Sequence, residues 1–135
     1  MADCLFCKII AGVIPSHKIY EDDAVVAFLD IHPVSTGHTL VVPKAHSTSL
    51  LDISSDDAQA VMIAIKKISA GLLAGVGADG LNVGSNCGES AGQDVFHTHI
   101  HLMPRQTGTP RTFVQMTVSQ DDLAATAEKI RQHLV

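Results

Sequence analysis

Apolar residues recur with a helical period in the middle of the chain, and this period predicts the longest helix. Ser54 and Ser55 can cap its first turn, and Gly75 and Gly77 are expected to end it. The apolar face of this helix is formed by side chains spaced at i, i+4, i+7 and i+11, namely Val61, Ile65, Ile68 and Leu72.

Two shorter helices are predicted toward the ends of the chain. Near the C-terminus, Ser119-x-x-Asp122 resembles a capping box that opens a helix. The apolar face of that helix consists of Leu123, Ala127, Ile130 and Leu134. Near the N-terminus, residues 6–11 can form a short helix that Gly12 ends.

The remaining regular pattern is that of β-strands separated by turns. Runs of β-branched and apolar residues predict strands at residues 17–21, 25–30, 38–43, 81–85 and 95–103. Most of these strands follow one another as hairpins, and the long helix is inserted between the third and the fourth. The pattern therefore predicts an α+β fold with a largely antiparallel sheet.

Composition and charge narrow the class of protein. A chain of 135 residues is expected to form one domain, and 46% hydrophobic against 17% charged residues excludes an intrinsically disordered chain. The formal net charge of −5 argues against broad binding to a nucleic-acid backbone, although a small phosphate ligand needs only local donors. No apolar run approaches the length of a transmembrane helix, and residues 1–4 lack the features of a secretory signal. We therefore expect a cytoplasmic protein with no nucleic-acid partner and no membrane partner.

The three cysteines point to metal chemistry or free thiols and not to a disulfide framework. Cys4, Cys7 and Cys87 are odd in number, and no secretory signal accompanies them. Cys4 and Cys7 form a C-x2-C pair, which is the spacing of many zinc half-sites. The pair supplies two of the four ligands of a structural zinc, so two free thiols near the N-terminus is an equally good interpretation at this point.

Three of the eight histidines are spaced by two residues within the predicted strand at residues 95–103. Because side chains alternate along a strand, His97, His99 and His101 would share one face. The opposite face would be formed by Phe96, Thr98, Ile100 and Leu102. Such a stripe could bind a catalytic metal, or one imidazole could act as a nucleophile on phosphorus, with His99 as the natural centre. The Gly-rich loop at residues 86–94 leads into this strand, and its amide side chains could hold phosphate oxygens.

These histidines resemble the motif of the histidine triad family. His97-Thr-His99-Ile-His101-Leu-Met matches a pattern of three histidines separated by apolar residues, except that Thr98 replaces the first apolar residue. The resemblance to the nucleotide-binding branch of the family rests on further segments that recur in order: Cys4-Leu-Phe-Cys-Lys-Ile-Ile, Ile14-Pro15, Tyr20-Glu21-Asp22-Asp23, Phe28-Leu-Asp30-Ile-His-Pro33, Gly37-His38-Thr-Leu-Val-Val-Pro43-Lys44-x-His46 and Gly92-Gln93. It is expected to define a domain at residues 4–110, with residues 111–135 as a helical extension of the same domain.

The resemblance implies both an architecture and an activity. The implied fold is a five-stranded antiparallel sheet with one long and several short helices, assembled as a homodimer. The implied activity is that of a nucleotidyl hydrolase or transferase that binds purine nucleotides such as AMP. Family members cleave nucleoside phosphoramidates or dinucleoside polyphosphates and release a nucleoside monophosphate.

The resemblance also assigns roles to histidines by their position in the motif. His99 corresponds to the nucleophile that forms a nucleotidyl-histidine, and His101 to the histidine that contacts the phosphate. His38 matches a further active-site histidine, and His97 orients the site.

The nucleotide contacts implied by the resemblance come from several segments. Asn86 and Gln93 match amides that contact the phosphate, and Asp30 matches the carboxylate that binds the ribose hydroxyls. Asp94 stands where a Ser or Thr hydroxyl is common, so its contact with the leaving group is open. The apolar pocket around the base would be lined by Leu5, Phe6, Ile9, Ile14, Phe28 and Ile31.

The same resemblance implies a use for the C-x2-C pair. Bacterial-type members hold a structural zinc with ligands that correspond to Cys4, Cys7, His46 and His97. Because Cys2His2 is a complete tetrahedral set, one structural zinc per chain and no catalytic metal are expected.

Two other functions stay open on the sequence. The same pocket fits a nucleotide-binding or regulatory scaffold protein whose hydrolase activity is incidental. A metallohydrolase would instead place a zinc on His97, His99 and His101, and chelation would then abolish the chemistry directly.

Overall fold

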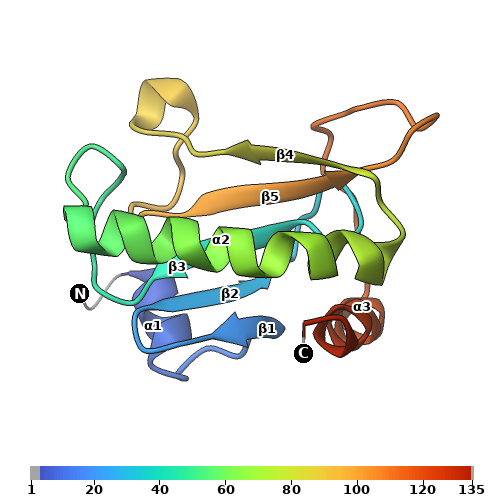
Figure 1. Ribbon diagram of the computed structural model, residues 1–135. Helices are drawn as coiled ribbons and strands as arrows, with labels where there is room; N and C mark the ends of the chain where they lie inside the picture. The colour runs from blue at the N-terminus through green and yellow to red at the C-terminus, as the bar shows by residue number, and fades with distance from the viewer. Residues whose placement is uncertain (1–3, 135) are drawn as a thin grey trace.

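The computed structural model describes residues 4–134 as a five-stranded sheet covered by three α-helices (Figure 1). The strands are β1 (Lys18–Glu21), β2 (Val25–Leu29), β3 (Thr39–Pro43), β4 (Gly80–Gly84) and β5 (Ile100–Arg105). The helices are α1 (Leu5–Ile10), α2 (Ser55–Val76) and α3 (Gln120–Gln132), and a 3-10 helix, η1 (Glu89–Ala91), precedes β5. The strands lie in the order β1-β2-β3-β5-β4, and every neighbouring pair is antiparallel. The predicted α+β fold with a five-stranded antiparallel sheet is therefore confirmed.

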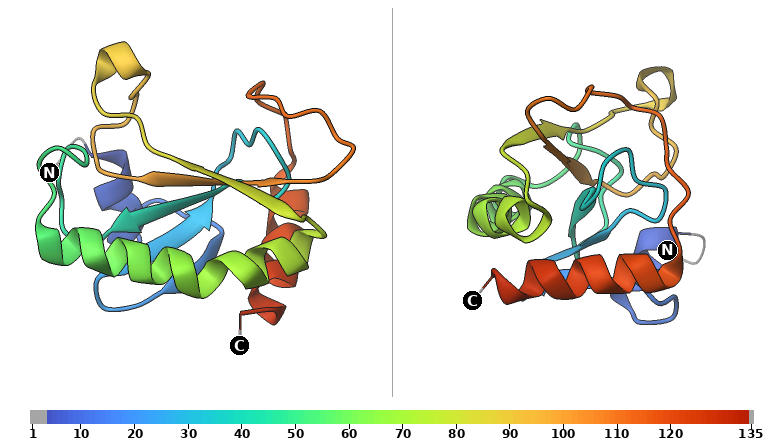
Figure 2. Two further views of the ribbon diagram at one scale, coloured as in Figure 1. Left: turned by 45° about the horizontal axis from the view of Figure 1, so that its top comes forward. Right: turned by 90° about the vertical axis from the view of Figure 1, so that its right-hand side faces the viewer.

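The central strands β2 and β3 are buried along their whole length, because helices cover the sheet from both sides. Val25, Ala27 and Leu29 pack in the core that contains side chains of α2 and α3. Val26 and Phe28, which point the other way, pack in a second core with side chains of α1. Figure 2 shows α1 and α2 on opposite sides of the sheet.

Helix α2 begins and ends at local signals, and all four residues of its predicted apolar face are buried. The side chain of Ser54 accepts the N–H of Asp57 at 3.1 Å, and Gly77 ends the helix in a left-handed conformation with φ of 69°. The prediction that Gly75 also ends the helix is wrong. A Cβ at position 75 would lie 2.8 Å from the Cα of Ile130, so the glycine allows α3 to approach α2 closely.

Helix α3 is part of the same core as α2. Ser119 caps it by accepting the N–H of Asp122 at 3.1 Å, as the sequence predicts. Leu123, Ala127 and Ile130 are buried against α2 and the sheet. The C-terminal extension thus contributes to the main hydrophobic core.

The strand predicted at residues 95–103 is wrong over its first half, because β5 begins at Ile100 and runs to Arg105. Pairing with β3 begins at Ile100, opposite Val41, and β3 ends two residues later at Pro43, which has no N–H to donate. Residues 95–99 run as a bent segment instead, in which Thr98 donates its N–H to Ser47 O at 2.8 Å. Of the face predicted to be core, Thr98, Ile100 and Leu102 are buried, whereas Phe96 is 47% exposed.

By length and composition, α2 is the one helix in residues 4–134 that could cross a membrane. Its buried side chains pack in the core against the sheet and α3, and they are Val61, Ala64, Ile65, Ile68 and Leu72. A core helix of a globular domain meets the same criteria, so the match in length and composition has little weight.

Candidate functional site

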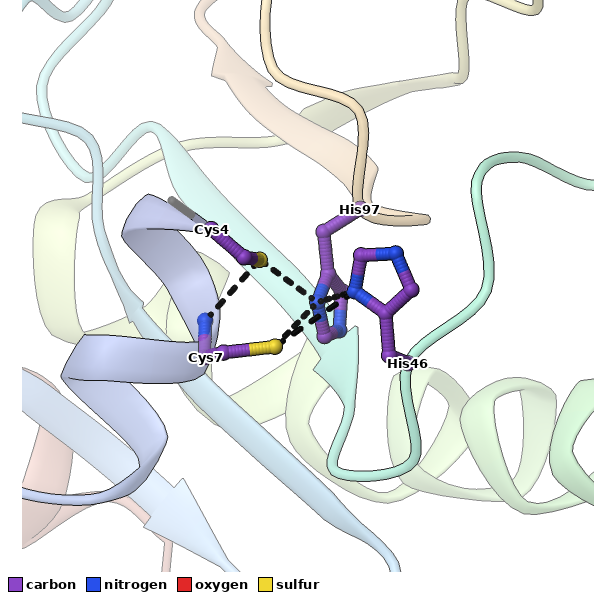
Figure 3. Close-up of side chains that lie close together, drawn as sticks. All are labelled: Cys4, Cys7, His46 and His97. Carbon is purple, nitrogen blue, oxygen red and sulfur yellow. Dashed lines mark hydrogen bonds between the residues drawn. The ribbon is translucent and has the colours of Figure 1, made fainter. Parts of the chain in front are cut away.

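Two cysteines and two histidines from three segments converge at the start of α1 (Figure 3). Cys4 is the N-cap of α1, Cys7 lies in its first turn, His46 follows β3, and His97 lies in the bent segment before β5. Nδ1 of His97 is 3.3 Å from Cys4 Sγ, 3.4 Å from Cys7 Sγ and 3.2 Å from His46 Nδ1. Ligand atoms around a tetrahedral zinc lie about 3.4–3.8 Å apart at ordinary bond lengths. The four side chains therefore have nearly the spacing of a metal site.

The hydrogen bonds of His97 leave the correct nitrogen free for a metal. Its Nε2 lies 2.8 Å from Pro43 O, and a carbonyl only accepts, so Nε2 carries the proton. Nδ1 then presents a bare lone pair to the cluster, where it faces the imidazole nitrogen of His46. Burial and the adjacent Cys4 thiol raise the pKa of Cys7, whereas a bound cation would favour its thiolate. This donor set fits one closed Cys2His2 metal site.

His99 follows His97, and a comparable bond determines its tautomer. Its Nδ1 lies 2.7 Å from the carbonyl oxygen of His97 and must donate to it. In the neutral ring, Nε2 is therefore unprotonated, and no hydrogen bond to it is found within residues 4–134. The ring is 5% exposed, and its centroid lies 5.0 Å from that of Phe6 and 5.1 Å from that of His101. A neutral imidazole held in this way can act as a nucleophile.

His38 and His101 form a hydrogen-bonded pair beside His99. Nδ1 of His38 accepts the N–H of Val34 at 3.1 Å, so its proton is on Nε2, which lies 2.9 Å from His101 Nδ1. The neutral His101 ring must then carry its own proton on Nε2. Burial lowers the pKa of His38 to about 4 against the opposing charge of Asp30, and burial also lowers the pKa of His101. Both rings are neutral at pH 7, and His101 has an N–H to donate.

The ligand atoms of Asp30, His38 and His101 also lie close enough together to hold a metal ion. A metal on Nε2 of His38 would displace the proton there while Nδ1 still accepts from a backbone N–H, which would require an imidazolate ring. The group is therefore better suited to passing a proton than to holding a metal. Among residues 4–134, the close donor groups do not combine His97 with His99 and His101, which argues against the metallohydrolase hypothesis.

A cavity of about 750 Å³ lies beside His99 and His101. Its apolar lining includes every predicted base-pocket residue, namely Leu5, Phe6, Ile9, Ile14, Phe28 and Ile31. Its polar lining includes Asp30, Asn86, Asp94, His38, His99 and His101. The cavity thus combines an apolar surface for a planar ring with polar groups for a sugar and a phosphate.

Two of the residues predicted to act on the nucleotide, Gln93 and His97, do not line this cavity. Gln93 is 4% exposed, and its amide bonds to three backbone groups. It accepts the N–H of Gly88 at 2.8 Å and donates to Thr48 O at 2.6 Å and Val95 O at 3.1 Å. Gln93 therefore ties the loop around η1 to the loop after β3, and His97 belongs to the group of cysteines and histidines that could hold a metal.

Two residues of the C-terminal segment, which belong to no recognised motif, also line the cavity. Phe113 and Gln115 lie between β5 and α3 in a segment without regular secondary structure. Arg105 holds this segment, because its Nη1 donates to Thr112 O at 2.8 Å and its guanidinium lies 5.1 Å from the ring centroid of Phe113. Their spacing by two residues is the only local signal, and it is too weak to have identified them.

The chain is similar to known proteins along most of its length. The HIT domain family matches residues 11–108. An uncharacterized HIT-like protein of Borreliella burgdorferi is 51% identical over 107 residues, which are 78% of this chain and 77% of that protein. Adenylylsulfatase HINT3 of Arabidopsis thaliana is 42% identical over 104 residues, which are 77% of this chain and 53% of that protein. A Zn-bound histidine triad family protein from Mycobacterium smegmatis has the same fold, with a TM-score of 0.89, 34% identity and coverage of 98% of this chain and 94% of that one.

Proposed function

The chain belongs to the HIT family, and we propose that it is a purine nucleotide-binding nucleotidyl hydrolase or transferase. Its substrates would be nucleoside phosphoramidates or dinucleoside polyphosphates, cleaved at the α-phosphate with release of a nucleoside monophosphate. The observation that carries the proposal is the tautomer of His99, because its Nδ1–H bond to His97 O leaves Nε2 bare beside the cavity.

The reaction would proceed in two displacements at phosphorus. Nε2 of His99 attacks the α-phosphorus, so that an N–P bond forms while the bond to the leaving group breaks. The N–H of His101 donates to a phosphate oxygen, and His38 holds His101 in the required tautomer. Water then attacks the nucleotidyl-histidine and releases the monophosphate. The leaving group takes up one proton and the attacking water loses one, so the protein returns to its starting state.

The cavity lining supports this assignment of a nucleotide. Asp30 and Asn86 line this cavity, where the carboxylate would accept hydrogen bonds from ribose hydroxyls and the amide would donate to phosphate oxygens. Asp94 lines the same cavity, where a carboxylate would favour a leaving group that carries a hydrogen-bond donor. For Gln93 we propose a supporting role, in which it holds the loop that carries Asn86.

The adenylyl part of the substrate is supported by one relative. HINT3 of Arabidopsis thaliana is named as an adenylylsulfatase, and the similarity to it covers 77% of this chain. We propose an adenylyl group for the substrate of the present chain, but we do not propose a sulfate leaving group. The reason is that the predicted residues line the parts of the cavity that would hold the base and the phosphate.

We also propose that Cys4, Cys7, His46 and His97 hold one structural zinc. The Zn-bound neighbour from Mycobacterium smegmatis and the bare Nδ1 of His97 support this proposal. Because the set is closed, the zinc would stabilise the fold around α1 and take no part in bond cleavage.

We also propose that the protein is a homodimer, that it forms a single domain and that it is cytoplasmic. Exposed apolar side chains on the outer face of α2 and on the edge strand β4 support a homodimer, and these are Met62, Ile63 and Val83. The burial of α3 in the main core supports a single domain that includes residues 111–135. Cys4, Cys7 and Cys87 form no disulfide among the described residues, which supports a reducing, cytoplasmic location.

Replacing the nucleophile tests the proposed function. We expect His99→Ala to lower kcat on adenosine phosphoramidate and on diadenosine polyphosphates by at least about a thousandfold. Mass spectrometry of the wild type with a slow substrate should detect a covalent nucleotidyl adduct, and His133→Ala, at the exposed end of α3, should leave kcat unchanged. Full turnover by the His99 variant would contradict the proposal, and tight AMP binding without turnover in the wild type would favour the scaffold function.

A further inference from the structure

One short helix carries two ligands of the metal cluster and part of the apolar wall of the cavity. Helix α1 spans six residues. Cys4 and Cys7 point their thiols into the cluster, as Figure 3 shows, whereas Leu5, Phe6 and Ile9 line the cavity. The position of α1 therefore determines the geometry of both sites.

Within the described chain, hydrogen bonds hold this helix to the rest of the protein only at the metal cluster. Every backbone hydrogen bond made by residues 4–14 is to another residue of the same segment. Its side-chain bonds to other segments are those of the Cys4 and Cys7 thiols with His46 and His97. A helix of this length is not stable by itself, so α1 depends on the cluster and on the burial of its apolar side chains.

Phe6 connects the metal cluster with the reacting centre. Its ring centroid lies 5.0 Å from that of His99, 6.1 Å from that of His97 and 5.5 Å from that of Phe28, and each contact is edge-to-face. A displacement of α1 would remove a wall of the cavity and the packing of His99 at the same time.

We propose that metal binding in the cluster and nucleotide binding in the cavity are positively coupled through α1. This inference rests on the proposed function, since it concerns the nucleotide of the same cavity. With zinc on Cys4 and Cys7, the helix is already held where its apolar side chains form the wall, so the nucleotide does not have to order it. The coupling is reciprocal, and zinc raises the affinity for nucleotide by the factor by which nucleotide raises the affinity for zinc. Cys4 and Cys7 are thus positioning residues for a ligand that they do not touch.

Two ligands separate this coupling from a general effect of zinc on folding. AMP carries a base that would rest on the wall formed by α1, whereas ribose 5-phosphate lacks the base. By titration calorimetry, removal of zinc with a chelator should weaken AMP binding at least about fivefold and change ribose 5-phosphate binding less than about twofold. Equal AMP affinity in the two forms overturns the inference. Equal weakening for both ligands also overturns it, because that result indicates a general loss of folded protein.

The zinc affinity measures the same coupling from the other side. In competition with a chromophoric chelator, saturating AMP should lower the zinc Kd by the factor found for AMP. Phe6→Leu should reduce this factor, which is the ratio of the zinc Kd without AMP to the zinc Kd with AMP, and Cys87→Ser, outside the cluster, should preserve it. An undiminished factor in the Phe6 variant overturns the inference even if the stripped protein unfolds. Failure of the zinc-loaded wild type to bind AMP would contradict the proposed function itself.

Discussion

The buried side chain of His38 should make the folded protein sensitive to mild acid. The residue is 3% exposed, and burial holds its pKa at about 4, compared with an ordinary value of 6.5. The folded state therefore keeps this ring neutral, while the unfolded chain takes up a proton as the pH falls below 6.5. The stability that the neutral ring contributes is fully present above pH 6.5 and is lost progressively as the pH falls toward 4.

The size of this loss follows from the difference between the two pKa values. Each pH unit below 6.5 removes about 1.4 kcal/mol of the free energy of unfolding, until the folded state also begins to bind the proton. Between pH 7 and pH 5, His38 alone should therefore account for a loss of about 2 kcal/mol.

Urea unfolding of three proteins at the two pH values tests this reasoning. In His38→Asn, the carboxamide oxygen can still accept the N–H of Val34, so the variant keeps the backbone bond without a titrating ring. The wild type and the exposed-site control His32→Asn should lose about 2 kcal/mol more between pH 7 and pH 5 than His38→Asn loses. The same loss in all three proteins would refute the assignment of acid sensitivity to the buried ring.

Three further variants probe features that the tertiary structure revealed. Gly75→Ala should lower the free energy of unfolding by about 1–2 kcal/mol in urea, because the added Cβ meets the backbone of α3. This loss is expected although alanine favours helices over glycine. The control Ala74→Gly, at an exposed position of the same helix, should lower it by no more than about 1 kcal/mol. A stabilised Gly75 variant would contradict the close approach of the helices. Gln93→Leu should cost at least about 2 kcal/mol by the same measurement, since three backbone groups lose their partner, and an unchanged stability would show that water replaces the amide. Phe113→Ala should weaken AMP binding about threefold or more in calorimetry. The control Val114→Ala should bind AMP like the wild type, because Val114 does not line the cavity. Equal AMP affinities of the wild type and the Phe113 variant would exclude the C-terminal segment from the binding surface.

Features that depend on neighbours in sequence were predictable from the sequence. The apolar faces of α2 and α3 and their caps at Ser54 and Ser119 follow from the helical period and from side-chain bonds within one turn. The strands β1, β2, β3 and β4 were predicted to within one residue at each end, because alternation and turn residues are equally local signals.

Features that depend on segments far apart in sequence were not predictable. Gly75 looks like a helix end in the sequence, but it lies inside α2 because α3 passes against it. Residues 95–99 look like a strand, but their neighbour β3 has already ended at Pro43, so a loop carbonyl takes the N–H of Thr98 instead. In both cases the deciding partner lies more than 40 residues away.

The spacing of His97, His99 and His101 by itself predicted a site built on these histidines, and the resemblance to a family predicted how metal and phosphate divide them. Only the tertiary structure decided which nitrogen of His97 and of His99 is free, because Pro43 O is 54 residues from His97, and His97 O meets Nδ1 of His99 in a segment that bends where the sequence predicts a strand. In the tertiary structure, Gln93 lies outside the lining of the cavity and Phe113 is part of it. Residue types and spacing specify which chemistry is available, but a proton's position on a ring depends on the groups packed around it, and those are set by long-range packing.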